Sequence, residues 1–376
     1  MTVIDIAKSL ISFDSSGPPT QEKPVADWIH DYLKDLGVDS TVQVVGHERA
    51  NVVAKIGEGK DPGVVLSGHI DVVPAGDLHL WSETSPYEAK VANGKLFGRG
   101  ACDMKGPDAC ILQAFKELRN EDFKRQLTLV FTSGEDTGGW FVDKVLGDKL
   151  VTSKEAKFGI IPEPSMMKIV RTHKGGGGCT IVIHGKAAHS SRPELGVNAI
   201  LHAADFLQEI KALQKEIDHE KLPLLGPSTI KPTLINGGFK SNIIPDRCEI
   251  TINSRLIPIH ANIKTMTGWL TKIIKKMKSR DPTFKAEIQG LRTSEALEVP
   301  EDSEVIKLVK GILNTEPIGV QYYTEAVSYS KNGIPTIICG PGDIEQAHTP
   351  DEYITLEQLD AGTEFFKQVI KRTCLI

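Results

Sequence analysis

The stretch that decides the fold reads Ser67-Gly68-His69-Ile70-Asp71-Val72-Val73-Pro74. An apolar run at residues 63–66 precedes it and is typical of a buried strand, so this strand ends on a histidine and a carboxylate. Residues two apart in a strand share one face, so Asp71 can hold the His69 ring in one tautomer while the imidazole binds a metal ion. The motif is short, and a structural histidine is the usual alternative explanation.

Four further segments place reactive side chains beside glycine or proline, each directly after or near an apolar strand-like run or before a helical pattern. Loops of this kind hold functional groups on a rigid scaffold. The candidates they supply are Asp103 within residues 98–106, the pair Glu135-Asp136 after the run 127–131, Glu163 between Pro162 and Pro164, and His348 within residues 340–353. The glycines at 98 and 100 do not predict a dinucleotide loop, because the spacing of G-x-G-x-x-G is not met.

These segments complete a set of metal donors. It has two imidazoles and three carboxylates, from His69, Asp103, Asp136, Glu163 and His348. Such a set suits two divalent cations of the zinc class, which lie about 3.5–4 Å apart in two-metal sites and together polarise a carbonyl and activate a water. Glu135 is left over and is placed to move the proton. The chain has no G-x-S-x-G elbow and no recognisable Cys/His protease motif, which leaves metal-assisted amide hydrolysis.

Nearly the whole chain, in order, resembles the di-zinc amidohydrolase and metallopeptidase family of acetylornithine deacetylase, succinyl-diaminopimelate desuccinylase and glutamate carboxypeptidase. The resemblance implies that Asp103 bridges both metals, with zinc expected and cobalt or manganese as alternatives. It implies that His69 and Glu163 complete one site. Asp136 and His348 would complete the other, with Glu135 as general base and Asp71 as the partner of His69.

Two positions depart from that family pattern. Glu-Glu is usual where this chain has Glu135-Asp136, so the ligand is one methylene shorter and its metal is expected to bind more weakly or to shift. Glycine is usual where this chain has Pro162, whose fixed φ is expected to stiffen the Glu163 loop. The family often has a cis peptide after the bridging acid, which corresponds to Asp103-Met104 here.

Composition and segment order predict the class. The chain has 376 residues, enough for two domains, and a net charge of -5 that argues against a general nucleic-acid binder. No apolar run approaches the roughly 18–20 residues that span a bilayer, so no membrane partner is expected. Residues 1–10 lack the apolar core of a signal peptide, and we expect a cytoplasmic protein with free thiols.

Helical and strand-like segments alternate up to residue 170. This order predicts an α/β catalytic domain with a mainly parallel mixed sheet flanked by helices, and with ligands in loops at the carboxyl ends of the strands. The glycines at 175–178 are interpreted as a flexible hinge. The following β-α-β-β-α-β order predicts an inserted α+β ferredoxin-like lid or dimerisation domain at 175–292, with 1–174 and 293–376 forming the discontinuous catalytic domain.

The resemblance also assigns polar residues of the insert. His189 is expected to reach the active site, often that of a partner subunit, and to stabilise the oxyanion, which implies a homodimer. Asn242, Arg255 and Thr324 match positions where relatives bind the substrate's carboxylate or acyl group, a task that suits a guanidinium. The alternatives are a surface histidine, a turn asparagine, a surface arginine and an ordinary strand threonine.

Several segments are most similar to the acetylornithine deacetylase branch. They are Arg171-Thr172-His173-Lys174-Gly175, His189-Ser190-Ser191, Thr324-Glu325-Ala326, Gly340-Pro341-Gly342 and Gln346-Ala347-His348. We therefore expect hydrolysis of a small N-acyl amino acid such as N-acetylornithine. A succinyl-diaminopimelate desuccinylase, an N-acetyl-lysine deacetylase, a dipeptidase or carboxypeptidase, and a non-catalytic binding relative remain as alternatives, since few residues form an acyl pocket.

Overall fold

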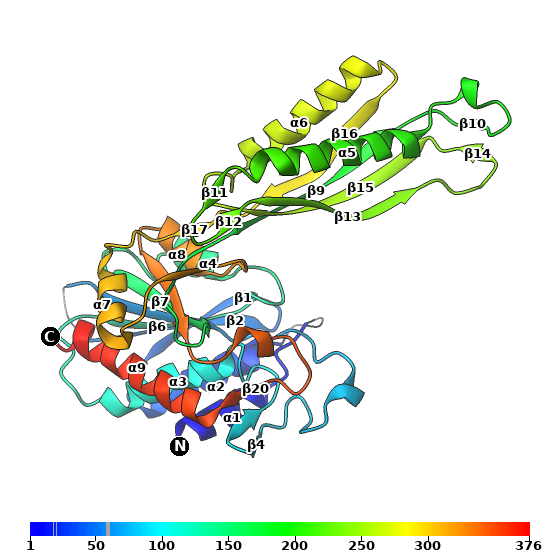
Figure 1. The fold of residues 1–376 in the computed structure, drawn as a ribbon. Helices are drawn as coiled ribbons and strands as arrows, with labels where there is room; N and C mark the ends of the chain where they lie inside the picture. The colour runs from blue at the N-terminus through cyan, green and yellow to red at the C-terminus, as the bar shows by residue number, and fades with distance from the viewer. Residues whose placement is uncertain (18, 20, 58–60) are drawn as a thin grey trace. The chain divides into compact units, whose positions relative to one another are not determined.

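The computed structural model describes residues 1–17, 19, 21–57 and 61–376. These residues form two compact units (Figure 1). The first consists of Met1–Arg171, Val299–Ile318 and Thr324–Ile376, and the second of Thr172–Glu298 and Gly319–Tyr323. The predicted division of the chain into a catalytic domain and an inserted domain stays a prediction.

The first unit contains a mixed sheet with helices packed against it. Its helices are α1 (Val3–Ile11), α2 (Lys23–Asp35), α3 (Lys105–Leu118), α4 (Val142–Gly147), α7 (Glu304–Leu313), α8 (Ala326–Lys331) and α9 (Leu356–Cys374). Its sheet strands are β1 (Ser40–Gly46), β2 (Arg49–Ile56), β3 (Gly63–His69), β6 (Leu127–Thr132), β7 (Ala156–Pro164) and β19 (Thr336–Gly340). A small separate sheet holds β4 (Lys90–Ala92), β5 (Lys95–Phe97) and β20 (Tyr353–Thr355).

The strand order β1-β2-β6-β3-β7-β19 places β3 inside the sheet. β3 runs parallel to both β6 and β7, and β7 runs parallel to β19, whereas β1, β2 and β6 pair antiparallel. Every residue of β3 is buried, as its apolar sequence predicts. The predicted α/β class with a mainly parallel mixed sheet is confirmed.

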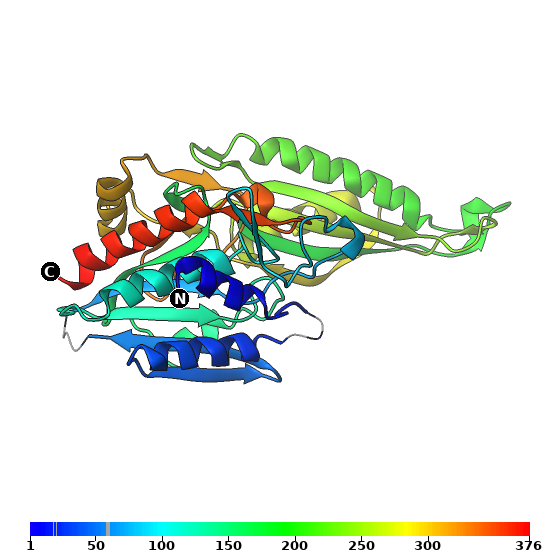
Figure 2. The same cartoon turned by 90° about the horizontal axis from the view of Figure 1, so that it is seen from below.

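Helices pack against the strands of this sheet. α3 and α9 pack against each other and against β3, and α8 contacts β7 and β19. In Figure 2, α2 lies alongside β1 and β2 at the blue end of the chain. α9 begins at a capping box in which Thr355 and Gln358 satisfy each other's backbone N–H groups.

The second unit has its own four-stranded sheet. The order is β13-β15-β9-β16, all antiparallel, from β9 (Gly175–His184), β13 (Thr229–Gly237), β15 (Arg247–Leu256) and β16 (Lys285–Thr293). The helices α5 (Ala199–Ile217) and α6 (Ile263–Arg280) share one apolar core with this sheet. The chain order is therefore β-α-β-β-α-β, as the sequence predicts. Short segments complete the unit: β10 (Ala188–His189), β11 (Lys221–Leu222), β12 (Gly226–Pro227), β14 (Ile243–Ile244) and β17 (Leu297–Glu298).

The four consecutive glycines are not a hinge loop, and that interpretation is wrong. Gly175 to Gly178 open β9, which is paired with β15 on one edge and with β16 on the other. Hydrogen bonding on both edges fixes this backbone, although glycine alone would leave it free.

Two strands, β8 (Val170–His173) and β18 (Ile318–Val320), run across the division of the chain into units. Within the part of the chain that the structure describes, no helix has both the length and the apolar composition needed to cross a membrane.

The pairing of β7 with β19 leads to a stability prediction. A Cβ at Gly340 would lie 2.1 Å from the backbone oxygen of Pro162, so Gly340→Ala must push these strands apart. We expect it to lower the free energy of unfolding by about 1–3 kcal/mol in urea titrations. Gly147→Ala is the control, because a Cβ there meets no atom of the described residues within 4 Å. Equal stability of the two variants would contradict the close packing of β7 on β19.

Candidate metal centre

Strand ends of the first unit bring the five predicted ligands together. His69 is the last residue of β3, and Glu163 lies near the end of β7. Asp136 follows β6, His348 follows β19, and Asp103 comes shortly before α3. Since β3, β6, β7 and β19 point the same way, their carboxyl ends meet at one edge of the sheet.

The donors form two groups that share Asp103. His69 Nε2 lies 3.1 Å from Asp103 Oδ1 and 3.7 Å from Glu163 Oε1. His348 Nε2 lies 3.3 Å from Asp103 Oδ2 and 3.1 Å from Asp136 Oδ1. Within each group, one donor atom per residue lies within 4.8 Å of the others. Asp103 therefore turns one carboxylate oxygen to each histidine.

These residues fit a pair of divalent cations. Asp136 Oδ2 is buried and has no hydrogen-bond partner among the residues that the structure describes. A buried carboxylate oxygen without a partner is costly, and a cation would satisfy it. Groups of three nitrogen and oxygen donors suit catalytic zinc-class ions, whose fourth ligand is water or substrate.

The charges of the site depend on each other. Burial raises the pKa of Glu163 well above its ordinary value. Burial also acts to raise the pKa of Asp103, but hydrogen bonds from His348 and His69 hold it below its ordinary value. Hydrogen bonds with Asp103 and Asp136 raise the pKa of His348 to about 10. Protons on the histidines thus compensate the carboxylates, and bound cations would displace those protons.

Asp71 contacts both His69 and the loop after β6, and only the contact with His69 was predicted from the sequence. The His69 ring donates from Nδ1 to the main-chain oxygen of Asp71 at 2.9 Å, while the Asp71 carboxylate is 3.7 Å away. That bond leaves Nε2 facing Asp103. The carboxylate instead accepts N–H groups from the loop after β6, at 2.9 Å from Gly134, 3.2 Å from Glu135, 2.9 Å from Asp136 and 2.7 Å from Thr137. Asp71 therefore holds the loop that carries Glu135 and Asp136.

Glu135 lies in this loop beside the ligands. Burial raises its pKa well above the ordinary value, and the charge of Asp136 adds to the rise. A carboxyl group in such surroundings is poised to accept and return a proton.

A buried ion pair, which the sequence reasoning missed, holds the turn at Asp103. Glu352 Oε1 accepts the N–H groups of Cys102 and Asp103 at 2.8 and 3.0 Å, and its Oε2 lies 2.6 Å from Arg99 Nη1. The peptide bond between Asp103 and Met104 is cis. The signal available in the sequence was the position of Glu352, four residues after His348. Its partners lie about 250 positions away, so the sequence did not predict these contacts.

The structure places the predicted substrate residues in both units. Thr324 belongs to the first unit, is buried, and accepts the N–H of Ala326 at the start of α8. His189 and Asn242 are exposed residues of the second unit, where His189 Nδ1 lies 2.7 Å from Ser191 Oγ and Asn242 O accepts the N–H of Ser190. Arg255 is exposed near the end of β15. The roles of these four residues stay predictions.

Comparison with known proteins shows the family. Peptidase family M20/M25/M40 matches residues 65–372. The chain belongs to the M20 peptidase family. An acetylornithine deacetylase of Proteus mirabilis is 30% identical, with 98% of this chain and 95% of the relative covered. That of Pectobacterium carotovorum is 32% identical, with 98% and 96% covered.

Solved structures show the same fold. A tripeptidase of Staphylococcus aureus matches with a TM-score of 0.77 at 20% identity, with 98% of this chain and 97% of that chain covered. An M20 metallo-carboxypeptidase of Sulfolobus solfataricus has a TM-score of 0.75 at 20% identity, covering 98% of each. A dinuclear metal-binding M20 peptidase of Bacillus subtilis has 0.70 at 17% identity, with 98% and 96% covered. The family resemblance seen in the sequence is confirmed, and this M20 protein is an enzyme that acts on amide bonds.

The contacts of Asp71 lead to a prediction for this M20 enzyme. Asp71→Asn turns one acceptor oxygen into an NH₂ donor that faces two backbone N–H groups of residues 134–137. We expect faster amide hydrogen exchange at these residues and a loss of about 1–3 kcal/mol in the free energy of unfolding. Asp77→Asn is the control, because among the described residues that exposed carboxylate accepts only the N–H of His79. Unchanged exchange at 134–137 would contradict the proposed anchoring.

Proposed function

We propose that this M20 enzyme hydrolyses the amide bond of a small N-acyl amino acid, with N-acetylornithine as the first candidate. The observation that carries the proposal is the pair of donor groups that share Asp103, with Glu135 beside them. The acetylornithine deacetylases that match along nearly the whole chain support the substrate. A non-catalytic relative would be expected to lose donors or the base, and this chain keeps them.

Other amide substrates fit the same centre. A succinyl-diaminopimelate desuccinylase or an N-acetyl-lysine deacetylase needs only a different acyl or side-chain pocket. The likeness in fold to a tripeptidase and to a carboxypeptidase keeps peptide substrates as a further alternative.

Two divalent ions, zinc first and cobalt or manganese as alternatives, would be held by the two donor groups. His69 and Glu163 would hold one ion, Asp136 and His348 the other, and Asp103 both. When bound, such ions polarise the scissile carbonyl and lower the pKa of water. The shorter Asp136 in place of the family's usual glutamate makes its site the weaker of the two in this proposal.

The chain's own residues would carry the proton and align the substrate. Glu135, held in place by Asp71, takes the proton of the attacking water on its carboxylate and delivers it to the leaving amine. His189 would stabilise the oxyanion. Asn242, Arg255 and Thr324 would bind the carboxylate or acyl group of the substrate.

We also propose a homodimer formed through the second unit. β13 is an edge strand of that unit's sheet, and Leu234, Ile235 and nearby Phe239 are 63%, 52% and 78% exposed. Apolar side chains on an open strand edge favour pairing with another copy of the chain. A partner subunit is what the proposed role of His189 requires.

The general-base role leads to a direct test. Glu135→Gln keeps the size of the side chain but cannot take a proton, so we expect kcat to fall about 10²- to 10⁴-fold. Metal content, measured by inductively coupled plasma mass spectrometry, should match that of the parent. Glu121→Gln is the control, since Glu121 is exposed after α3.

The assay screens N-acetylornithine, N-acetyl-lysine, succinyl-diaminopimelate and dipeptides with the zinc-loaded parent. Hydrolysis by Glu135→Gln at the parental rate would show that another group is the base. A parent that cleaves dipeptides alone would reject the deacylase proposal.

A further inference from the structure

His348 is the exposed member of the donor set. Its side chain is 53% exposed, whereas those of the other four donors are between 2% and 8% exposed. Its backbone also has a φ of 63°, in the left-handed region that residues other than glycine adopt at a cost. Neither burial nor backbone preference fixes this imidazole, so contacts elsewhere in its turn must do so.

The turn after His348 is not held by its own backbone N–H groups. Pro350 has no N–H group, and among the described residues those of His348, Thr349 and Asp351 find no acceptor. Asp351 also has a left-handed φ, of 52°. A turn with two such residues and no hydrogen bonds from its own N–H groups needs other contacts to keep its shape.

Contacts with two other segments of the first unit attach the turn. The buried Arg99 donates from Nη1 to the main-chain oxygen of Thr349 at 3.2 Å. The Asp351 carboxylate makes shorter contacts: Oδ1 accepts the N–H groups of Ser82 and Glu83 at 2.9 and 3.0 Å, and Oδ2 accepts the Ser82 hydroxyl at 2.6 Å. Hydrogen bonds to an ionised carboxylate are about twice as strong as those between neutral groups. Asp351 is therefore the strongest attachment within residues 348–351.

The segment that Asp351 binds is itself fixed. Trp81, the residue before Ser82, is buried, and its Nε1 donates to the main-chain oxygen of Ala75 at 2.9 Å. The guanidinium carbon of Arg99 lies 5.2 Å from the centre of the Trp81 ring. Because this segment is anchored, hydrogen bonds to it restrain the turn at Asp351.

We propose that Asp351 is a positioning residue for His348. By holding residues 348–351 to the segment before β4, its carboxylate keeps the imidazole beside Asp103 and Asp136. Its importance for the reaction rests on the proposed two-metal hydrolysis, in which His348 holds the second ion. The donors of the first ion at the ends of β3 and β7 do not depend on this contact. The inference therefore predicts an effect on one metal site and not on the other.

Asp351→Gly tests the role of the carboxylate. Glycine adopts a left-handed φ without strain, so this substitution removes the side-chain contacts and still allows the backbone conformation. We expect the second zinc ion to bind about 10- to 100-fold more weakly and the first to bind as in the parent. Titration of the metal-free proteins against a competing chelator measures both affinities. In the metal-free protein, amide hydrogen exchange should also become faster at Ser82 and Glu83.

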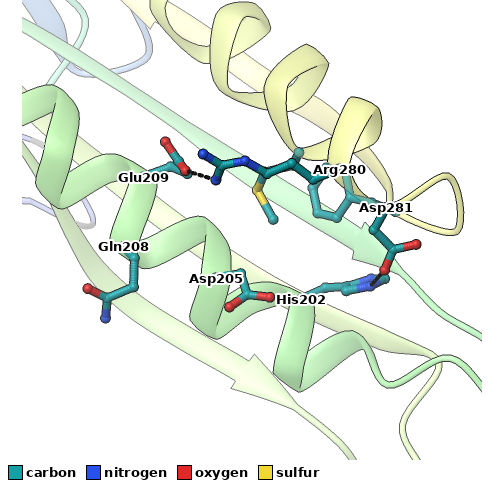
Figure 3. Close-up of a pocket in the computed structure, with 8 residues that line it drawn as sticks. His202, Asp205, Gln208, Glu209, Arg280 and Asp281 are labelled. Carbon is teal, nitrogen blue, oxygen red and sulfur yellow. Dashed lines mark hydrogen bonds and ion pairs between the residues drawn. The ribbon is translucent and has the colours of Figure 1, made fainter.

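Asp281 of the second unit provides a matched control. Figure 3 shows it beside His202 in a hollow between α5 and α6. It accepts the N–H group and the hydroxyl of Thr283 at 2.8 and 2.6 Å, and its Oδ2 lies 3.0 Å from His202 Nε2. Asp281→Gly therefore removes a carboxylate with partners of the same kinds, from the unit that holds none of the five donors. We expect both zinc affinities to equal those of the parent.

Asp351→Asn separates position from charge. The amide oxygen of asparagine can accept the two N–H groups, its NH₂ can donate to the Ser82 hydroxyl, and asparagine tolerates a left-handed φ. We therefore expect this variant to regain most of the affinity for the second ion. A loss caused only by the missing negative charge would be the same in the glycine and asparagine variants. Circular dichroism checks that all variants are folded.

The outcomes distinguish this inference from the proposed function. Equal affinity for the second ion in Asp351→Gly and the parent would overturn the inference while the proposed metal centre stands. Equal weakening of both sites, or equal losses in the glycine and asparagine variants, would overturn it as well. A parent that binds fewer than two zinc ions would overturn the proposed centre.

The ring signal of His348 decides the inference even in that case. It is observed by nuclear magnetic resonance in metal-free protein with isotope-labelled histidine, and is identified by its absence in His348→Gln. The inference requires this signal to shift in Asp351→Gly and to stay in place in Asp281→Gly. An unshifted signal in Asp351→Gly would contradict it.

Discussion

The carboxylate of Asp103 is the group on which the rest of the site depends. It lies between two imidazoles, with Oδ1 3.1 Å from His69 Nε2 and Oδ2 3.3 Å from His348 Nε2. Burying this carboxylate without a positively charged partner would cost a large free energy. The groups around it therefore either hold its position or compensate its charge. The two donor groups are adjacent because they share this residue.

Two other buried carboxylates hold the loops that carry the site. Asp71 accepts the N–H groups of residues 134–137, and Glu352 accepts those of Cys102 and Asp103. A charged acceptor that binds several backbone donors fixes a loop more firmly than neutral contacts do. The loops after β6 and before α3 therefore present Glu135, Asp136 and Asp103 from backbones that are themselves anchored, which is what a centre with fixed geometry requires.

Much of the fold and of the donor set could be predicted because the signals are local. Each ligand stands at the end of an apolar run or beside glycine or proline, and parallel strands collect such ends at one edge. The Glu352–Arg99 pair and the loop contacts of Asp71 could not be predicted, since they depend on backbone positions brought together by the whole fold. The glycines of β9 were misread for the same reason: the strands that order them, β15 and β16, come from residues 247–256 and 285–293.

The number of metal ions bound per chain tests the central claim most directly. The protein and its variants are saturated with zinc, freed of excess metal, and measured by inductively coupled plasma mass spectrometry, with circular dichroism to check the fold. If Asp103 serves both donor groups, the parent binds two ions, His348→Ala keeps one, and Asp103→Ala keeps neither at full occupancy. A folded Asp103→Ala protein that still binds two ions would contradict a shared carboxylate at the centre of the site.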